Sequence, residues 1–428
     1  MLAAILALQA TQQQSDYPVY DTDLLPPAEY TARREKLLAA MPKGSVGVLF
    51  TNAVHVRNND VDFDFRADSD FLYTTGFTEP NAAVLLSPDG ITVDGKTAKA
   101  WLFLDPPSGM SVTWLGYRMG PEGAKRVLGI DALPNRRFPE IVKALGAKPI
   151  LGGTLPPGAN DSLVTMANAL PAGVKRPPLS PMIAEMRWIK SPAEIAMLRK
   201  AVNASIEGHR LAQAAAKPGL HEYDLEAIAE MGFKRNGCED MGYPSILGAG
   251  ENSCILHYNT NRRLLKAGDV VCMDAGGEYH GYTADVTRTF PVSGKFSPEQ
   301  KAIYDLVLAA QNAGIGECVS GKPFNAPGQA ATRVIAEGLK KLGIIQKDAE
   351  VRKYFMHGTS HSLGLDVHDV MPLDSTLKPG VVLTVEPGIY IRAGSPVDKK
   401  WWNIGCRIED DILVTKGAPD NLSGALSR

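Results

Sequence analysis

The stretch VVCMDAGGEYHGYTADVTRTF, residues 270–290, carries two aspartates in a pattern that could support catalysis. Two extended runs rich in Val, Tyr and Thr flank a Gly-containing middle, which is typical of a β-hairpin. Asp274 and Asp285 lie symmetrically about Tyr279 and His280, so a reversal there would place the two carboxylates opposite each other. Opposed side chains on one face have Cβ atoms about 5 Å apart, and like charges there are destabilising. The pattern therefore predicts something that compensates the repulsion.

Further acidic and imidazole side chains follow in strand-like segments. Glu386 ends the apolar run VVLTV, and Pro387 favours an extended backbone at that glutamate. Glu409 follows Arg407 by two residues, so both side chains share a face if the segment is a strand. Charged groups in apolar surroundings are costly unless they are paired or bind a metal. The segment MHGTSHSLGLDVHD adds His357, His361 and His368.

Divalent cations held among these groups would turn the repulsion into coordination. Carboxylate oxygens with one imidazole favour harder ions such as Mn²⁺ over a thiolate-bound structural zinc. Four carboxylates exceed the need of one ion, and bridging carboxylates hold two ions about 3.5–4 Å apart, which activates a shared water and polarises a substrate carbonyl. The residues alone leave other interpretations open: surface or turn aspartates, a simple ion pair of Glu409 with Arg407, and histidines that only fill the core or a loop.

Two similar sets of elements must position these groups. Ser191, Pro192 and Glu194 predict a capped helix start, and the same three capping roles recur at Ser297, Pro298 and Gln300. Each start is followed by a second helical pattern, at 224–237 and 328–343, and then by strand-like segments. The sequence therefore predicts a pseudo-duplicated arrangement of helix, helix and strands, whose two sets of strands face one central cleft.

A smaller α/β domain is expected upstream. A helical pattern at 32–41 precedes short strand patterns at 44–50, 82–87 and 99–104. Pro- and Gly-rich stretches then place a domain boundary near residues 175–187. We expect an α/β (α+β) chain with an N-terminal extension at 1–26, a first domain at 27–180 and a catalytic domain at 188–420.

Bulk composition excludes several classes of protein. The chain has 428 residues, more than the about 250–300 that one core usually serves, and its net charge is -2 with no long basic block. Nucleic acid is therefore not expected as a partner, nor is a membrane, because no run approaches about 20 apolar residues. The five cysteines never form a C-x-x-C pair and are expected to be reduced and mostly buried. Residues 1–10 are apolar and small and have about the length of the apolar part of a signal peptide, but no positive charges precede them. A cytoplasmic location is expected, with export to the periplasm as the alternative if these residues are a signal remnant.

Taken together, the motifs resemble a known family. DAGGEYHGYTADVTRTFPVSGKF, HGTSHSLGLDVHD, LTVEPGIYI and RIEDDILVT resemble the five-ligand signature of the pita-bread metallopeptidases, which include aminopeptidase P, prolidase, methionine aminopeptidase and creatinase. ADSDFLYTTGFTEPNAAVLL resembles the N-terminal domain of aminopeptidase P. The resemblance implies a C-terminal pita-bread fold and two divalent ions, Mn²⁺ first, with Co²⁺ or Zn²⁺ as alternatives.

The resemblance also implies roles for individual residues. Asp285 and Glu409 would bridge the two ions, while His361 and Glu386 would hold one of them. Glu386 would also handle the proton of the attacking water as a general acid and base. The implied metal ligands are Asp274, Asp285, His361, Glu386 and Glu409.

Other residues are implied to act on the substrate. His257 and His368 match histidines that bind substrate and stabilise the tetrahedral intermediate. His357 matches a third active-site histidine, Arg407 would steady the ligand cluster, and Tyr390 would line the pocket.

The implied activity is hydrolysis of the Xaa-Pro bond at a peptide N-terminus by a homo-oligomer, a dimer or a tetramer. One departure from the family favours an alternative: after His257 and Tyr258 this chain has Asn259 to Arg263, where aminopeptidase P has acidic residues. Arg262 or Arg263 could bind a substrate carboxylate, which would favour an Xaa-Pro dipeptidase or a carboxypeptidase. A metal-free binding module is the alternative of another class, and creatine hydrolysis is disfavoured because that relative lacks the full ligand set.

Overall fold

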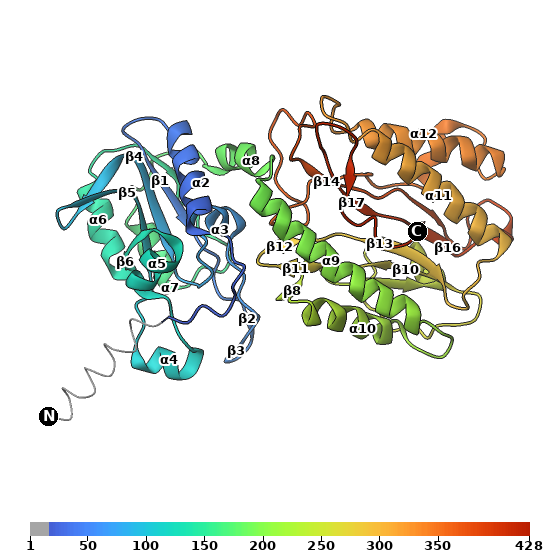
Figure 1. Ribbon diagram of the computed structural model, residues 1–428, viewed down its shortest axis with the longest axis horizontal. Coiled ribbons are helices and arrows are strands. Elements are labelled where there is room, and N and C mark those ends of the chain that lie inside the picture. The colour runs from blue at the N-terminus through green and yellow to red at the C-terminus, as the bar shows by residue number, and fades with distance from the viewer. Residues whose placement is uncertain (1–16) are drawn as a thin grey trace. The chain divides into compact units, whose positions relative to one another are not determined.

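The computed structural model describes residues 17–428 (Figure 1). It comprises two compact units, the first ending at Met186 and the second beginning at Arg187. The apolar segment 1–10, for which a signal remnant was considered, lies outside the described residues.

The first unit is built on a five-stranded mixed sheet with strand order β6-β5-β4-β1-β7. Its strands are β1 (Val46–Phe50), β4 (Ala83–Val93), β5 (Lys96–Leu104), β6 (Asp131–Pro134) and β7 (Ile150–Gly152), with a separate hairpin of β2 (Val56–Asn58) and β3 (Val61–Asp62). Its helices include α2 (Pro27–Ala40), α3 (Ser69–Thr75), α4 (Gly109–Leu115), α5 (Gly120–Leu128), α6 (Phe138–Ala144), α7 (Asp161–Asn168) and, at the unit boundary, α8 (Ser180–Arg187). The predicted helix at 32–41 and the predicted strands at 44–50, 82–87 and 99–104 are confirmed, with shifted ends.

The second unit repeats the order helix, helix, strands, as predicted. Its first half contains α9 (Pro192–Ala215), α10 (Glu222–Arg235), β8 (Asp240–Met241), β9 (Ile246–Ala249), β10 (Val270–Asp274), β11 (Gly277–Tyr279), β12 (Tyr282–Thr283) and β13 (Thr287–Pro291). Its second half contains α11 (Pro298–Gly316), α12 (Ala326–Lys341), β14 (Val382–Val385), β15 (Gly388–Ile391), β16 (Ile404–Arg407), β17 (Asp410–Leu413) and β18 (Asp420–Asn421), with the short 3₁₀ helix η3 (Asp348–Lys353) after α12.

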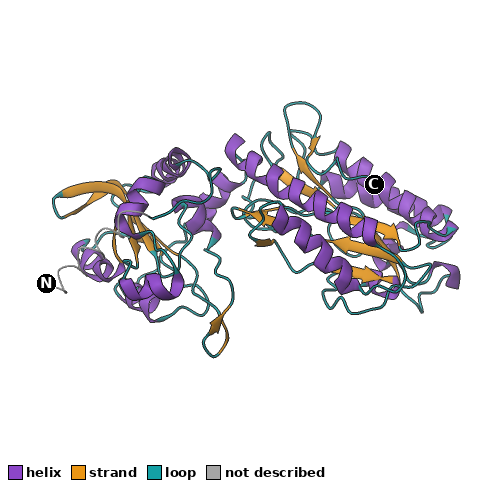
Figure 2. Ribbon diagram, turned by 60° about the horizontal axis from the view of Figure 1, so that its bottom comes forward, coloured by secondary structure: helices purple, strands orange, loops and turns teal. Residues whose placement is uncertain are grey.

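Each helix pair packs against its own strands. In the first half, a buried cluster joins Phe233 of α10 to Leu247 and Val271 in the strands. In the second half, a separate cluster joins Ile335 of α12 to Ile389 in β15. The purple helices of this unit lie beside the orange strands in Figure 2. Each half therefore packs its strands against its own pair of helices.

Glycine lets the first helix pair approach closely. A Cβ on Gly208 of α9 would lie 2.3 Å from the ring of Phe233, and a Cβ on Gly232 of α10 would lie 2.5 Å from Cα of Gly208. Neither contact tolerates a side chain. The spacing of the two helices thus depends on this glycine pair.

The predicted helix starts are confirmed. The Ser191 hydroxyl accepts from the amide of Glu194, whose carboxylate accepts from the amide of Ser191 in return. Ser297 and Gln300 make the same reciprocal pair at the start of α11. A capping serine is worth about 1 kcal/mol.

The aspartate hairpin forms, but its pairing differs from the prediction by two residues. The turn lies at His280 and Gly281, with φ of 49° and 83°, so Asp274 is paired with Thr287 rather than with Asp285. Two residues of positive φ suit a tight two-residue loop, which fixes the pairing of the strands. Because side chains alternate with period two, the shift keeps both aspartates on one face.

The cysteines are free and buried, as expected: Cys238, Cys254, Cys272, Cys318 and Cys406. Across residues 17–428, no helix combines the length and apolar character needed to cross a membrane.

Candidate metal centre

A cavity of about 520 Å³ gathers the acidic side chains from the strands of both halves. Asp274 ends β10, Asp285 precedes β13, Glu386 directly follows β14, and Glu409 lies between β16 and β17. The cavity is also lined by His257, His357, His361, His368 and Arg407. Strand ends from two separate sets of strands thus converge on one site.

His361 lies at the middle of the acidic cluster. Its Nε2 atom is 3.2 Å from Oδ2 of Asp285, 3.6 Å from Oε1 of Glu386 and 4.0 Å from Oε1 of Glu409. Ligand atoms of Asp285, His361 and Glu409 all lie within 4.8 Å of one another. One small cation could therefore contact several of these groups at once.

Tyr243 joins Asp274 to this group. Its hydroxyl lies 2.6 Å from Oδ1 of Asp274 and 2.6 Å from Oδ1 of Asp285. A hydroxyl carries one proton, so it can donate to only one of the two carboxylates at a time. The Arg407 guanidinium donates to the other oxygen of Asp274 at 2.5 Å.

The acid groups differ in how readily they ionise. Burial raises the pKa of Asp285, and the nearby charge of Asp274 raises it further. Burial also acts on Asp274, but the charge of Arg407 and the hydrogen bonds of this carboxylate bring its pKa below the usual value. Burial raises the pKa of Glu386 to about 8, and burial with the charge of Asp285 raises the pKa of Glu409 well above its usual value.

His361 is a base, and burial and the nearby carboxylates shift its pKa in opposite directions. Burial alone would lower its pKa, but the hydrogen bond and charge of Asp285 raise it to about 9. The cluster thus retains protons that a divalent cation would replace, since metal ligands must be deprotonated. The donor set of carboxylate oxygens and one imidazole nitrogen fits such a cation.

Neighbouring polar groups orient the candidate ligands. The Thr287 hydroxyl donates to Oε2 of Glu409 at 2.6 Å. The carbonyl of Ser362 lies 3.1 Å from Nδ1 of His361 and accepts its N–H, which leaves Nε2 to face the cluster. The amide of Asp285 donates to Oδ2 of Asp411 at 3.1 Å.

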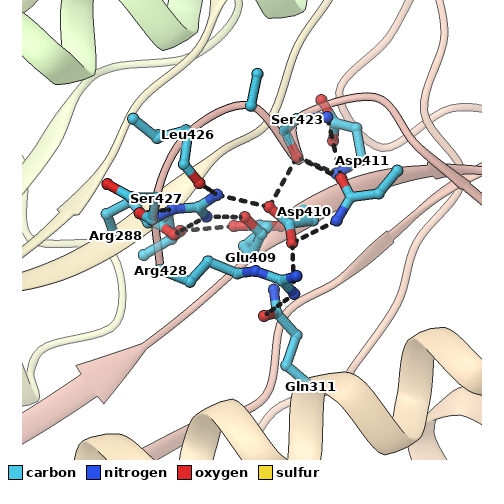
Figure 3. Close-up of polar contacts among 12 residues, drawn as sticks. Arg288, Gln311, Glu409, Asp410, Asp411, Ser423, Leu426, Ser427 and Arg428 are labelled. Atoms are coloured by element: carbon cyan, nitrogen blue, oxygen red, sulfur yellow. Dashed lines mark hydrogen bonds and ion pairs between the residues drawn. The ribbon is translucent and has the colours of Figure 1, made fainter.

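A buried arginine, Arg288, holds the backbone at Glu409 in place (Figure 3). Nη1 of Arg288 donates to the carbonyls of Thr287 at 2.9 Å and Glu409 at 2.7 Å. Its Nη2 atom donates to Oδ1 of Asp410 at 2.7 Å and to the carbonyl of Leu426 at 2.9 Å. Arg288 and Asp410 are both buried, so the ion pair ties β13, β17 and the segment near residue 426 together.

Tyr390 lies behind the cavity and does not line it, contrary to the prediction. Its hydroxyl accepts from Nη1 of Arg407 at 2.8 Å and lies 2.8 Å from Nε2 of His357. Nδ1 of His357 lies 2.6 Å from the carbonyl of Gly358, so it carries the proton and Nε2 accepts from Tyr390. Burial and the charge of Arg407 lower the pKa of His357 to about 4, which keeps this imidazole neutral.

His257 and His368, to which the resemblance assigned a role in substrate binding, both line the cavity. The ring of His368 packs edge-on against His361, with centroids 4.3 Å apart. Burial lowers the pKa of His368, so its imidazole is neutral at neutral pH. Both side chains are available to a ligand in the cavity.

Neither Arg262 nor Arg263 is brought to the cavity. The guanidinium of Arg262 lies over the ring of Tyr223 at 5.3 Å from its centroid. Arg263 pairs with Asp269 at 2.6 Å and with Glu251 at 2.9 Å. Their predicted contact with a substrate carboxylate therefore has no geometric support within this chain.

Three contributing residues were not predicted from the sequence. Thr287 lies two residues after Asp285, so strand alternation could have placed it on the same face. Tyr243 and Arg288 reach the site through contacts distant in sequence, and no local pattern marks them.

Sequence patterns of known families match both units. Residues 196–416 match metallopeptidase family M24, and residues 30–150 match the aminopeptidase P N-terminal domain.

Individual relatives align over nearly the whole chain. The Xaa-Pro aminopeptidase of Haemophilus influenzae is 38% identical over 426 residues, covering 94% of this chain and 96% of the relative. The Xaa-Pro aminopeptidase of Escherichia coli is 36% identical, covering 93% and 95%. Among solved structures, proline aminopeptidase P II from Yersinia pestis has a TM-score of 0.86 at 37% identity, covering 94% of this chain and 97% of that one. The Zn-substituted aminopeptidase P of E. coli in complex with product has a TM-score of 0.87 at 36% identity, covering 94% and 96%. These neighbours have the pita-bread fold that the motifs implied.

Proposed function

Because the chain belongs to metallopeptidase family M24, we propose that it is a metal-dependent exopeptidase that removes the N-terminal residue from peptides with proline at the second position. The aligned Xaa-Pro aminopeptidases support the reaction and the bond cleaved. The observation that carries the proposal is the convergence of Asp285, His361 and Glu409 in one cavity with two exposed histidines.

The candidate ligands for divalent ions are Asp274, Asp285, His361, Glu386 and Glu409. Bound ions would lower the pKa of a water molecule and polarise the scissile carbonyl. We propose two ions, because four carboxylates exceed the need of one. We propose Mn²⁺ as the native metal, with Co²⁺ or Zn²⁺ as alternatives, because hard oxygen donors predominate.

The chain's own residues have distinct proposed roles around the scissile bond. Glu386 takes up and returns the proton of the attacking water, a role that suits a carboxylate lining the cavity beside the other candidate ligands. His257 and His368 face the cavity as donors to the negative charge that develops on the carbonyl oxygen. Arg407 and Tyr390 hold Asp274 and the neutral His357 in place.

Proline selectivity needs a site that accepts a ring and a nitrogen with no N–H to donate. A cavity of about 520 Å³ has room for a short peptide segment, since ligand pockets commonly span about 300–1,000 Å³. The alternatives of an Xaa-Pro dipeptidase or a carboxypeptidase rested on Arg262 and Arg263, which lie outside this cavity lining. No feature of residues 17–428 favours a metal-free binding module, because every candidate ligand lines the same cavity.

A panel of peptides tests the proposal. Metal-depleted protein is reconstituted with Mn²⁺, Co²⁺ or Zn²⁺ and assayed on Xaa-Pro-Ala-Ala and the matched Xaa-Ala-Ala-Ala. Cleavage of the first bond of the proline peptide alone is expected, with Glu386→Gln lowering kcat by about 10²–10⁴. Cleavage of both peptides at equal rates, or of neither with any metal, would overturn it. Gel filtration of the same samples tests the proposed dimer or tetramer.

A further inference from the structure

A second cavity of about 660 Å³ adjoins the metal centre. It lies between α12, the 3₁₀ helix η3 and the segment that follows η3. Three residues, His357, Gly358 and Ser360, line both cavities, so this segment forms a shared rim. A peptide that extends beyond the metal centre can therefore continue over the rim without leaving the protein surface.

The second cavity carries more positive than negative charge. Its cationic side chains are Arg333, Lys340 and Arg352, and its acidic side chains are Glu337 and Asp348. Lys340 and Asp348 pair with each other at 2.6 Å. Arg352 donates to the carbonyl of His357 at 3.2 Å. Arg333 is exposed and has no hydrogen bond or ion pair among the residues that the structure describes.

The charge of the second cavity suits one end of a peptide substrate. A peptide that is cleaved at its first bond has a carboxylate at its far end. Because opposite charges attract, this carboxylate is favoured at the cationic side chains of the second cavity. The substrate would then extend from the metal centre toward Arg333.

We propose that the second cavity binds the part of the peptide that follows proline, and that Arg333 binds the C-terminal carboxylate of short peptides. The inference rests on the proposed function and adds a preferred substrate length and end group. A guanidinium can hold a carboxylate through two parallel hydrogen bonds. Each added residue moves the carboxylate by about 3.4 Å, so one peptide length will place it best.

The test compares end groups across a length series. The fully metal-loaded protein is assayed on Xaa-Pro-(Ala)n peptides, with n from 1 to 5, each as the free acid and as the C-terminal amide. At one length the free acid is expected to have a KM about fivefold below that of its amide, the size expected for an exposed ion pair. Arg333→Glu is expected to remove the advantage of the free acid, and the comparison of acid with amide within this variant separates that loss from any general change in KM.

A matched control distinguishes the cavity from general charge. Lys341→Glu makes the same charge change one residue beyond Lys340 on α12, at an exposed position outside the cavity lining. It is expected to keep the acid-to-amide ratio of the unaltered protein. Arg333 is preferred over Arg352 because Arg352 contacts His357 of the metal centre.

The outcomes separate this inference from the proposed function. Equal KM values for acids and amides at every length, or a ratio that Arg333→Glu does not alter, overturn the inference while Xaa-Pro cleavage stands. If no peptide is cleaved, the proposed function is wrong. Fluorescence anisotropy of labelled acids and amides then tests whether the second cavity binds the C-terminal carboxylate. Equal binding of the two end groups in that measurement also overturns the inference.

Discussion

At the scale of single residues, protons and divalent cations compete for the candidate ligands. His361 lies among Asp285, Glu386 and Glu409, and its pKa is raised to about 9 by the hydrogen bond and charge of Asp285 despite burial. Burial raises the pKa of Glu386 to about 8. Both groups therefore hold a proton at pH 7, and both must lose it to bind a cation.

Metal affinity is accordingly expected to rise with pH. Below pH 8, a cation must displace the protons of both His361 and Glu386, so Mn²⁺ affinity increases as pH increases from 6 to 9 and levels off above the two pKa values. Titration calorimetry in buffers of different ionisation enthalpy measures the protons released when Mn²⁺ binds, and their number is expected to fall as pH increases from 6 to 9. Affinity that is independent of pH would show that these groups are not ligands.

The hydroxyl of Thr287 is expected to support metal binding through Glu409, to which it donates at 2.6 Å. Thr287→Val keeps the shape but removes the donor, so Mn²⁺ affinity is expected to fall about tenfold or more, since a hydrogen bond to a charged group contributes about 1.5–3 kcal/mol. Thr287→Ser keeps the hydroxyl and should retain affinity. Competition with a fluorescent chelator measures both variants, and equal loss in the two would assign the effect to packing instead.

Sequence motifs identified the residues that carry ionisable chemistry, but not all their neighbours. The acidic residues and histidines stand in recognisable local patterns, and the structure brings them to one cavity. Tyr390 was placed in the pocket wrongly, because its strand reaches the site yet its ring is buried behind His357. Arg262 was assigned by proximity to His257 in sequence, but its side chain lies over Tyr223 instead.

At the scale of elements, helices were more predictable than strand pairing. Capping residues are local signals, and both predicted capping boxes form at Ser191 and Ser297. The hairpin register depends on where two positive φ values are accommodated, and His280 takes one of them although it is not a glycine. The prediction therefore placed the turn one residue too early. The prediction that both aspartates lie on one face still holds, because side chains alternate along a strand and a shift of two residues leaves the face unchanged.

The Arg288 and Asp410 ion pair is expected to stabilise the strands that carry the acidic cluster. Arg288→Met would remove one of the two guanidinium groups that pair with the fully buried Asp410 carboxylate, because Nη1 of Arg428 also lies 3.2 Å from its Oδ2. The expected loss is therefore smaller than the about 3–5 kcal/mol of a buried charge left with no partner. Arg288→Lys keeps the charge but not the fork that reaches the carbonyls of Thr287 and Glu409, so an intermediate loss is expected. Urea unfolding of the metal-free protein measures both, and unchanged midpoints would contradict the role.

At the scale of the whole molecule, the chain forms two compact units, and the acidic cluster belongs entirely to the second. The prediction of a domain boundary near residues 175–187 rests on Pro- and Gly-rich composition, because linkers use those residues. The convergence of four separated segments on one cavity could not be derived from local patterns, since it depends on how the two halves of the second unit pack.

Heating is expected to show this division. Units with separate cores can unfold in separate transitions, and a ligand raises only the transition of the unit that binds it. Saturating Mn²⁺ at about 100 times its dissociation constant is expected to stabilise residues 187–428 by about 2.7 kcal/mol. Scanning calorimetry with and without metal checks this, and equal shifts of every transition would show that the units unfold together.

The buried thiols give the second unit a built-in chemical reporter. All five cysteines lie after residue 186, and each is buried in the folded chain. Burial raises the pKa of Cys318 to about 12, so its reactive thiolate is scarce at neutral pH. An alkylating reagent will modify these sulfurs only when the second unit opens, whatever happens to the first unit. The rate of alkylation therefore measures opening of one unit in the intact chain, and a bound cation should slow it.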